Sequence, residues 1–245
     1  EAGNLYAVAT FGNVSSAPLE MPLKDGSSTS LAVTNNWGED YLLVKFNKDG
    51  EILWATGIGS KFRENGTPDV TVGEDGNPVI CGVFNAANGN LTNESEEKRE
   101  FYIGEQKYLL YPEQSKESAL VKLNSTDGSV MWSRYFTGTG NQEVLKVQAV
   151  SGSNAVAVTG KANNQIIVEG SAGLSTETVT HVPGADHLFV ISFDVDGKLL
   201  WSKSASGDTS SEGKEISSDD LGNIYVSGYF NGSLNWGDNI VLQKT

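Results

Sequence analysis

Residues Asp186 to Phe230 read DHLFVISFDVDGKLLWSKSASGDTSSEGKEISSDDLGNIYVSGYF, and this stretch decides the fold class. It holds four short runs that are apolar or that alternate between apolar and polar residues, with Gly, Asp or Asn between them: Leu188–Phe193, Lys198–Ser204, Gly213–Ser218 and Ile224–Phe230. Runs of this length and pattern are typical of antiparallel β-strands rather than helices. Four consecutive strands predict one four-stranded antiparallel sheet, or one blade of a β-propeller.

The same pattern recurs along the chain at a nearly constant spacing. A strand, an Asp-Gly turn and a strand that carries Trp occur three times, and the tryptophans, Trp54, Trp132 and Trp201, are 78 and 69 residues apart. Two independent markers keep this period, which indicates a repeat architecture. The second marker is the run after Gly-Asn, whose copies start 73, 78 and 68 residues apart: Gly3–Phe11, Gly76–Phe84, Asn154–Ala162 and Gly222–Phe230. The repeats span approximately residues 3–75, 76–153, 154–221 and, in part, 222–245.

The frame shared by these copies resembles a known family. D-x-F/L-V-x-x-F-x-x-x-G-x-L-W, followed by D-x-x-G-N-x-Y-V-x-G-Y-F, is similar to the SBBP-type bacterial β-propeller repeat, and Asp186–Phe230 matches it more closely than the other copies do. The resemblance implies an all-β propeller of four-stranded blades in a surface or secreted protein, of the kind found in gut Bacteroidetes. The G-x-L-W element also resembles the tryptophan motif of quinoprotein propellers. That likeness implies shared architecture only, because Cys81 is the single cysteine and those enzymes carry adjacent cysteines.

The predicted strand order leaves the repeats incomplete at both ends. If the run before Asp-Gly-Asn is the inner strand of a blade, the chain begins at a second strand, contains two whole blades, and ends at another second strand. Such an arc of about three and a half repeats would expose apolar blade faces. Three alternatives stay open: two chains close one ring as a homo-oligomer, the chain is a piece of a longer propeller, or about four unusual blades close the ring. Because the chain opens inside a repeat, we expect preceding residues to have been removed.

The recurring tryptophans are expected to pack between adjacent blades. A large, rigid aromatic at the same place in each repeat can fill the wedge to its neighbour and bury about 200 Å². Trp37 and Trp236 break the period and adjoin turns that contain Gly and acidic residues, so we expect them to be exposed. The Asp-Gly turns are explained by the positive φ that Gly supplies and by hydrogen bonds from Asp to its own backbone. No cofactor is expected, and the alternative for these turns is a weak Ca²⁺ site without the closing Glu of an EF-hand.

Composition and charge narrow the classes of partner. With 31 acidic and 17 basic residues the net charge is −14, which disfavours nucleic acids and anionic membrane surfaces. No apolar run approaches the roughly 20 residues of a membrane-spanning helix, and no signal peptide is visible. Cys81 falls at a strand position that other copies fill with Val8, Thr159 and Ser227, so it is predicted to be a core residue.

Carboxylates offer the one enzymatic alternative. Asp208, Glu212 and Glu215 flank the start of a predicted inner strand, near the axis of the ring. A pair of carboxylates at a suitable separation can hydrolyse a glycosidic bond. The two histidines, His181 and His187, have no further His or Cys at metal-ligand spacing, so a zinc site is not predicted.

The sequence therefore predicts a non-catalytic, extracellular or cell-envelope propeller that binds a glycan or a protein, or acts in adhesion. The loops Ser60–Thr67, Thr137–Gln142 and Ser206–Glu212 each link a Trp strand to the next inner strand, so they share one end of the ring and would carry the contacts. The candidate ligand-binding residues are Asp208, Glu212, Glu215, Trp37 and Trp236. The alternatives are a carbohydrate-active enzyme that uses the three carboxylates and a purely structural repeat segment of a larger surface protein.

Overall fold

The computed structural model describes residues 3–12, 18–31, 39–60, 66–85, 100–104, 106–109, 116–171, 173–179, 181, 183–237 and 240–243, and these form antiparallel β-sheets. The strands, in chain order, are β1 (Leu5–Gly12), β2 (Leu19–Pro22), β3 (Ser28–Leu31), β4 (Glu39–Phe46), β5 (Ile52–Ser60), β6 (Asp69–Val72), β7 (Pro78–Asn85), β8 (Glu100–Ile103), β9 (Gln106–Leu109), β10 (Lys116–Leu123), β11 (Val130–Thr137), β12 (Gln142–Val150), β13 (Ala155–Ala162), β14 (Ile166–Gly170), β15 (Glu177–Val179), β16 (His187–Phe193), β17 (Leu199–Ser204), β18 (Ser211–Ser218), β19 (Ile224–Phe230), β20 (Ser233–Asn235) and β21 (Val241–Gln243).

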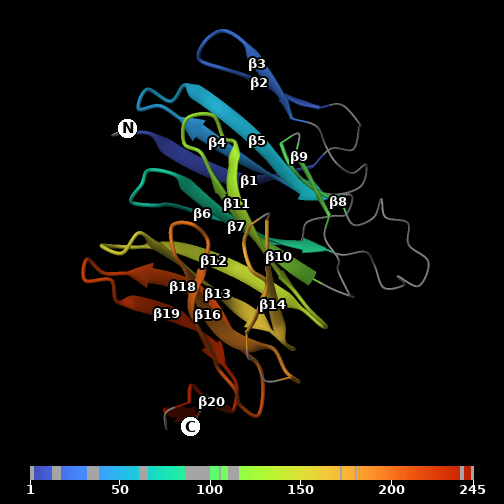
Figure 1. Ribbon diagram of the computed structural model, residues 1–245, viewed down its shortest axis with the longest axis vertical. Coiled ribbons are helices and arrows are strands. Elements are labelled where there is room, and N and C mark those ends of the chain that lie inside the picture. Colours follow the sequence, from blue (N-terminus) through green and yellow to red (C-terminus); the bar gives the residue numbers. More distant parts are fainter. Residues whose placement is uncertain are drawn as a thin grey trace, which may run out of the picture.

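Four sheets follow one plan and are stacked one on another (Figure 1). The third sheet is the simplest, with the strand order β12-β13-β16-β17, and the same order of four recurs in the second sheet as β6-β7-β10-β11. We name these positions first (β6, β12, β18), second (β1, β7, β13, β19), third (β4, β10, β16) and fourth (β5, β11, β17). The first sheet contains only second to fourth strands among these positions, and the fourth sheet contains β18 and β19. The all-β prediction with four-stranded antiparallel sheets is confirmed.

Hairpins extend the first and second sheets beyond their fourth strands. β8 and β9 lie in the chain between β7 and β10, yet β8 pairs with β5 of the preceding sheet. In the same way β14 and β15 lie between β13 and β16, and β14 pairs with β11. Burial of Ile166, Val168 and Val179 supports the β14–β15 hairpin. Two further hairpins, β2–β3 and β20–β21, each form a two-stranded sheet.

Close backbone contact explains a glycine that recurs in the second strand. A Cβ on Gly160 would lie 1.9 Å from the carbonyl oxygen of Glu143, and a Cβ on Gly228 would lie 2.0 Å from that of Glu212. The facing first strands β12 and β18 shift register at this point, which is the signature of a β-bulge. Only a residue without a side chain lets the bulged strand approach this closely.

The apolar core lies between the sheets, in three clusters. Alternate residues of each second strand face opposite neighbours: in β7, Ile80 and Phe84 pack toward the first sheet, whereas Val79 and Cys81 pack toward the third. Cys81 is buried, as predicted, and burial raises the pKa of its thiol. The third cluster joins the third and fourth sheets and includes Ile216. Period-two alternation thus builds two interfaces from each internal sheet.

The stack is open at both ends. Figure 1 places the first and fourth sheets far apart, and in the described part of the chain no strand of one pairs with a strand of the other. Leu5 on β1 is 62% exposed, and on β19 Tyr225 and Tyr229 are 56% and 48% exposed. The alternative in which about four unusual blades close the ring is therefore wrong for these residues, because the faces that closure would bury are left to solvent.

Candidate functional site

The first strands β12 and β18 each carry a carboxylate near their start, at the same place in the repeat. Glu143 and Glu212 are the second residues of these strands, and each pairs in register with the second strand of its own sheet, opposite Lys161 and Tyr229 respectively. The bulge that the strand glycines accommodate lies immediately after each carboxylate. Repetition of the backbone therefore places two carboxylates on neighbouring sheets.

Lys161 lies between these two carboxylates. Its Nζ is 3.7 Å from Glu143 Oε1, 3.6 Å from Glu212 Oε2 and 3.4 Å from Asp186 Oδ2. Two more lysines flank the group, since Lys116 Nζ is 3.2 Å from Glu143 Oε2 and Lys214 Nζ is 2.5 Å from Glu212 Oε1. We call these six residues (Lys116, Glu143, Lys161, Asp186, Glu212 and Lys214) the charged cluster. Its three positive and three negative side chains compensate one another.

The charges and hydrogen bonds around Glu212 and Lys161 outweigh the effect of burial on the pKa of each group. The side chains of Glu143 and Glu212 are only 8% and 6% exposed. Burial alone would raise the pKa of the Glu212 carboxyl, but hydrogen bonds from Lys214 and Tyr229 and the charge of Lys161 outweigh it, so the pKa is lowered. Burial would likewise lower the pKa of Lys161, and the charges of Glu143, Glu212 and Asp186 outweigh it, so that pKa is raised.

This arrangement disfavours the carboxylates as a proton-transferring pair. Hydrolysis of a glycosidic bond by two carboxyl groups requires one of them to hold its proton near neutral pH, through a raised pKa. Here Lys161 Nζ lies 3.7 Å from Glu143 and 3.6 Å from Glu212, and the pKa of Glu212 is lowered rather than raised. The cluster is therefore suited to fixing the position of the strand starts and of the loops that precede them.

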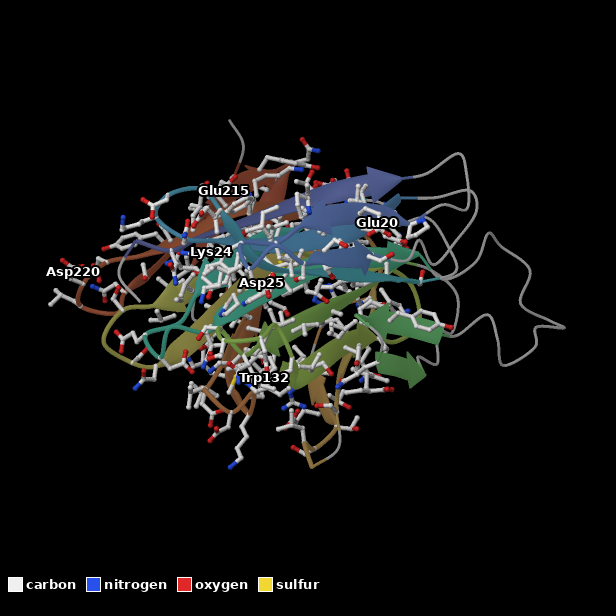
Figure 2. All side chains as sticks on the ribbon, turned by 90° about the horizontal axis from the view of Figure 1, so that it is seen from above. Glu20, Lys24, Asp25, Trp132, Glu215 and Asp220 are labelled. Atoms are coloured by element: carbon white, nitrogen blue, oxygen red, sulfur yellow. The ribbon has the colours of Figure 1, made fainter. Side chains whose placement is uncertain are left out.

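A second row of charges joins the first strands farther along. Asp69, Lys146 and Glu215 occupy equivalent places on β6, β12 and β18, and Lys146 Nζ is 3.8 Å from Asp69 Oδ1 and 3.4 Å from Glu215 Oε1. Asp69 Oδ2 also accepts a hydrogen bond of 3.0 Å from the amide of Val147. In Figure 2, Glu215 and Trp132 lie on opposite sides of the molecule, at the first-strand and fourth-strand edges of the sheets. The row therefore holds the first strands side by side along one edge of the stack.

The structure separates the predicted site residues. Glu212 belongs to the charged cluster, and Glu215, with a side chain 65% exposed, belongs to the second row. Asp208 is exposed in the loop before β18 and accepts a hydrogen bond of 2.8 Å from Ser233 Oγ. Trp236 is half-buried against the third core cluster, so its expected exposure is met only in part. Trp37 lies outside the described residues.

Sequence reasoning missed most of the charged cluster. Lys161 and Asp186 come from a second strand and from the residue before a third strand, and Lys116 comes from another sheet. One signal could have found Glu143: an acidic residue recurs directly after the loop that follows a Trp strand, as it does at Glu212. The lysines carry no such signal, because their partners depend on how adjacent sheets pack.

The two histidines, for which no zinc site was predicted, lie together in the fold. The rings of His181 and His187 have centroids 6.1 Å apart and are 6% and 2% exposed. A ring nitrogen of His181, Nε2, is 2.6 Å from the carbonyl oxygen of Ala162. Burial is the main cause that lowers the pKa of both side chains, so both are neutral in the folded protein at pH 7.

Acidification is expected to destabilise the fold through this histidine pair. Because the folded-state pKa values lie below the ordinary value of 6.5, the unfolded chain binds more protons as the pH falls below about 6.5, and stability falls with it. Urea unfolding at pH 7.5, 6.5 and 5.5 measures the slope of the free energy of unfolding against pH. These pH values lie above the range in which most carboxylates titrate. A variant with His181→Gln and His187→Gln should lose the slope; an unchanged slope in that variant would assign it to other groups.

Comparison of the chain with protein-family models and with curated proteins found no match. In the part of the chain that the structure describes, no helix is long and apolar enough to cross a membrane.

Proposed function

We propose that the chain is a non-catalytic recognition module, a segment of a β-propeller in an extracellular or cell-envelope protein, that binds a glycan or a protein. The observation that carries the proposal is the position of Lys161 between Glu143 and Glu212. Lys161 is ion-paired with both carboxylates and the pKa of Glu212 is lowered, so the cluster supports a rigid platform better than it supports acid–base chemistry. This argues against a carbohydrate-active enzyme that uses Glu143 and Glu212 as its pair of carboxylates.

The repeated plan supports the propeller assignment. Four sheets that follow one plan are stacked face to face, and the three first strands, β6, β12 and β18, lie side by side, joined by the row Asp69, Lys146 and Glu215. In a propeller the first strands line the axis and the loops that enter them share one end of the ring. Completion of the ring requires further blades.

Two of the predicted contact loops are held by their own hydrogen bonds. In the loop before β12, Gln142 Nε2 donates to the carbonyl of Thr139 at 3.0 Å, and the amide of Asn141 donates to Asn163 Oδ1 at 2.8 Å. In the loop before β18, Asp208 is tied to Ser233. Ordered loops lose little conformational entropy when they bind, which favours recognition of a polar ligand.

An exposed aromatic ring adjoins these loops. Tyr229 is 48% exposed, its hydroxyl donates to Glu212 Oε2 at 2.7 Å, and Lys214 Nζ lies 5.6 Å from the ring centroid. A fixed aromatic ring beside hydrogen-bonding groups offers both stacking and polar contacts to a sugar or a protein side chain. The platform therefore contains both kinds of group that glycan and protein recognition use.

The test is binding of the folded protein to a glycan and protein array, with and without Ca²⁺. Wild-type protein should bind one ligand class with saturation, and a variant with Asp208→Ser and Thr209→Gly should bind at least tenfold more weakly. The matched control carries Lys48→Ser and Asp49→Gly in an exposed turn at the other end of the sheets, and it should bind like wild type. A blank array, or equal binding by both variants, would contradict the proposal.

The structural repeat segment is the second candidate, and the open ends of the stack favour it. The exposed faces of β1 and β19 are surfaces of the kind that further sheets cover within this chain. A blank array with a folded sample would make this the better assignment.

A further inference from the structure

A cavity of about 380 Å³ lies between the second and third sheets. Its walls come from the turn that follows β6, the end of β10 with the start of β11, the connection after β14, and the turn that follows β16. Both turns are at the end of the sheets opposite the loops that enter the first strands. Figure 2 shows Trp132, which lines the cavity, on the far side of the molecule from Glu215. The volume is in the range, on the order of 300–1,000 Å³, that small-molecule sites have.

A buried lysine forms part of the wall. The Lys122 side chain is 3% exposed, its Nζ is 2.5 Å from Asp75 Oδ2, and it donates to the carbonyl oxygen of Val195 at 3.0 Å. An ammonium group carries three N–H groups, so these two partners leave one N–H for a ligand. The carbonyl of Val195 also accepts a hydrogen bond of 2.9 Å from Trp132 Nε1, which fixes the ammonium relative to the indole.

Two carboxylates line the cavity with this ammonium group. Asp75 is held by its own turn, since the backbone amide and Nδ2 of Asn77 donate to it at 3.1 and 3.0 Å. Burial alone would raise the pKa of the Asp75 carboxyl, but hydrogen bonds from Lys122 and Asn77 outweigh it, so the pKa is lowered. Asp196 is exposed at the rim. An ionised carboxylate accepts hydrogen bonds and donates none, so a ligand must bring the donors.

Apolar side chains form much of the remaining surface. Met131 is 50% exposed, and Leu174 is half-buried and packs against the core cluster between the second and third sheets. Trp132 contributes little surface, because it is only 6% exposed. Since Met131 and Asp196 are both exposed, the cavity opens to solvent, and a ligand attached to a longer chain can enter it.

This mixture of groups favours hydroxyls over charged ligands. A cationic ligand would satisfy the carboxylates but would face the ammonium group of Lys122. An anionic ligand would face Asp75 and Asp196 in a chain whose net charge is −14. A hydroxyl group both donates and accepts, so neighbouring hydroxyls can donate to the carboxylates and accept from the lysine.

We propose that this cavity binds a neutral pyranose ring, free or at the end of a glycan. Its hydroxyl groups donate to Asp75 and Asp196 and accept from Lys122. The less polar face of the ring packs on Met131 and Leu174, which removes apolar surface from water. The site lies apart from the loops on which the proposed function rests, so either assignment can fail without the other.

The experiment titrates the isotope-labelled full chain with the methyl glycosides of glucose, galactose, mannose and N-acetylglucosamine, and follows the indole N–H signals by NMR. We expect one of these sugars to shift the Trp132 signal with saturation. The Trp54 signal should stay unchanged, although Trp54 Nε1 makes the equivalent hydrogen bond, of 3.0 Å, to Ser125 between the first and second sheets. A trisaccharide that ends in the same sugar is the second arm: its binding assigns the end of a glycan, and its exclusion assigns a free sugar.

Asp196→Asn tests the recognition without changing the core, because Asp196 is exposed. Its dissociation constant for the sugar should be at least tenfold higher than that of wild type. Asp49→Asn is the matched control, since Asp49 precedes the glycine of the corresponding turn in the first sheet, and it should bind like wild type. The variant with Asp208→Ser and Thr209→Gly should also bind the sugar like wild type, which separates this site from the loops.

Three outcomes would overturn the proposal. The first is a folded chain in which no sugar of the panel shifts the Trp132 signal. The second is an Asp196→Asn chain that binds the sugar as tightly as wild type does. The third is saturation by N-acetyl-lysine methylamide with a lower dissociation constant than any of the sugars, which would assign the cavity to a cationic side chain. Circular dichroism establishes that each variant retains the fold.

Discussion

Replacing Trp132 by alanine is expected to lower the free energy of unfolding by about 3–5 kcal/mol, the usual loss for a large buried aromatic side chain. Trp132 is 6% exposed, packs in the cluster between the second and third sheets, and donates to the carbonyl of Val195. The substitution removes the packing, leaves a cavity and leaves the Val195 carbonyl short of one donor. Urea unfolding followed by far-ultraviolet circular dichroism measures the loss without relying on the fluorescence of the residue that is changed.

Trp201→Ala is the matched control, because it removes the same side chain from the same place in the repeat. Trp201 is 41% exposed, so its removal should cost less than about 1 kcal/mol. A third variant, Trp132→Phe, retains an aromatic ring but loses the indole donor, and we expect an intermediate loss. If Trp132→Ala and Trp201→Ala lower the free energy of unfolding equally, the contact of Trp132 with the third sheet does not stabilise the stack.

Replacing Arg134 by methionine is expected to cost about 3–5 kcal/mol, as breaking a buried ion pair usually does. Arg134 is fully buried, and its Nε and Nη1 donate to the carbonyls of Gly197 and Ser175, both at 2.6 Å, while Nη2 is 3.0 Å from Glu177 Oε2. The Arg134 side chain thus connects the second sheet to the turn of the third sheet that contains Gly197, and to Ser175 and Glu177. Methionine fills part of the volume but leaves these acceptors without their donor.

Lys203→Met provides the comparison for Arg134→Met, since Lys203 holds the equivalent position on the exposed strand β17. Its replacement should change stability by less than about 0.5 kcal/mol. Glu177→Gln should cost less than Arg134→Met, because the Glu177 side chain is 28% exposed and water can replace its partner. Equal losses for Arg134→Met and Lys203→Met, in chemical denaturation at pH 7, would rule out a special role for the buried guanidinium.

The strands and turns were predictable because they depend on residues close together in the chain. Alternation of apolar and polar residues encodes which face of a strand is buried, as at Ile224–Phe230, and Gly in the Asp-Gly turns supplies the positive φ seen at Gly50 and Gly197. The fixed period of Trp54, Trp132 and Trp201 predicted packing between sheets, since equivalent positions in a repeat meet equivalent surroundings. The prediction is confirmed for Trp54 and Trp132, which are 7% and 6% exposed, and is wrong for Trp201, which is 41% exposed.

The partners of these elements could not be predicted from local pattern, because they depend on the register and packing of distant segments. The hairpin β14–β15 pairs with β11 of the preceding sheet, although β13 and β16, which flank it in the chain, belong to the next. Lys161 forms ion pairs with Glu143, Asp186 and Glu212, which come from three separate strand starts. Trp201 has the same sequence signal as Trp132 yet is exposed. The repeat period and the alternation of apolar and polar residues predict which face of a strand a residue lies on. The packing of the sheets decides which side chains cover that face.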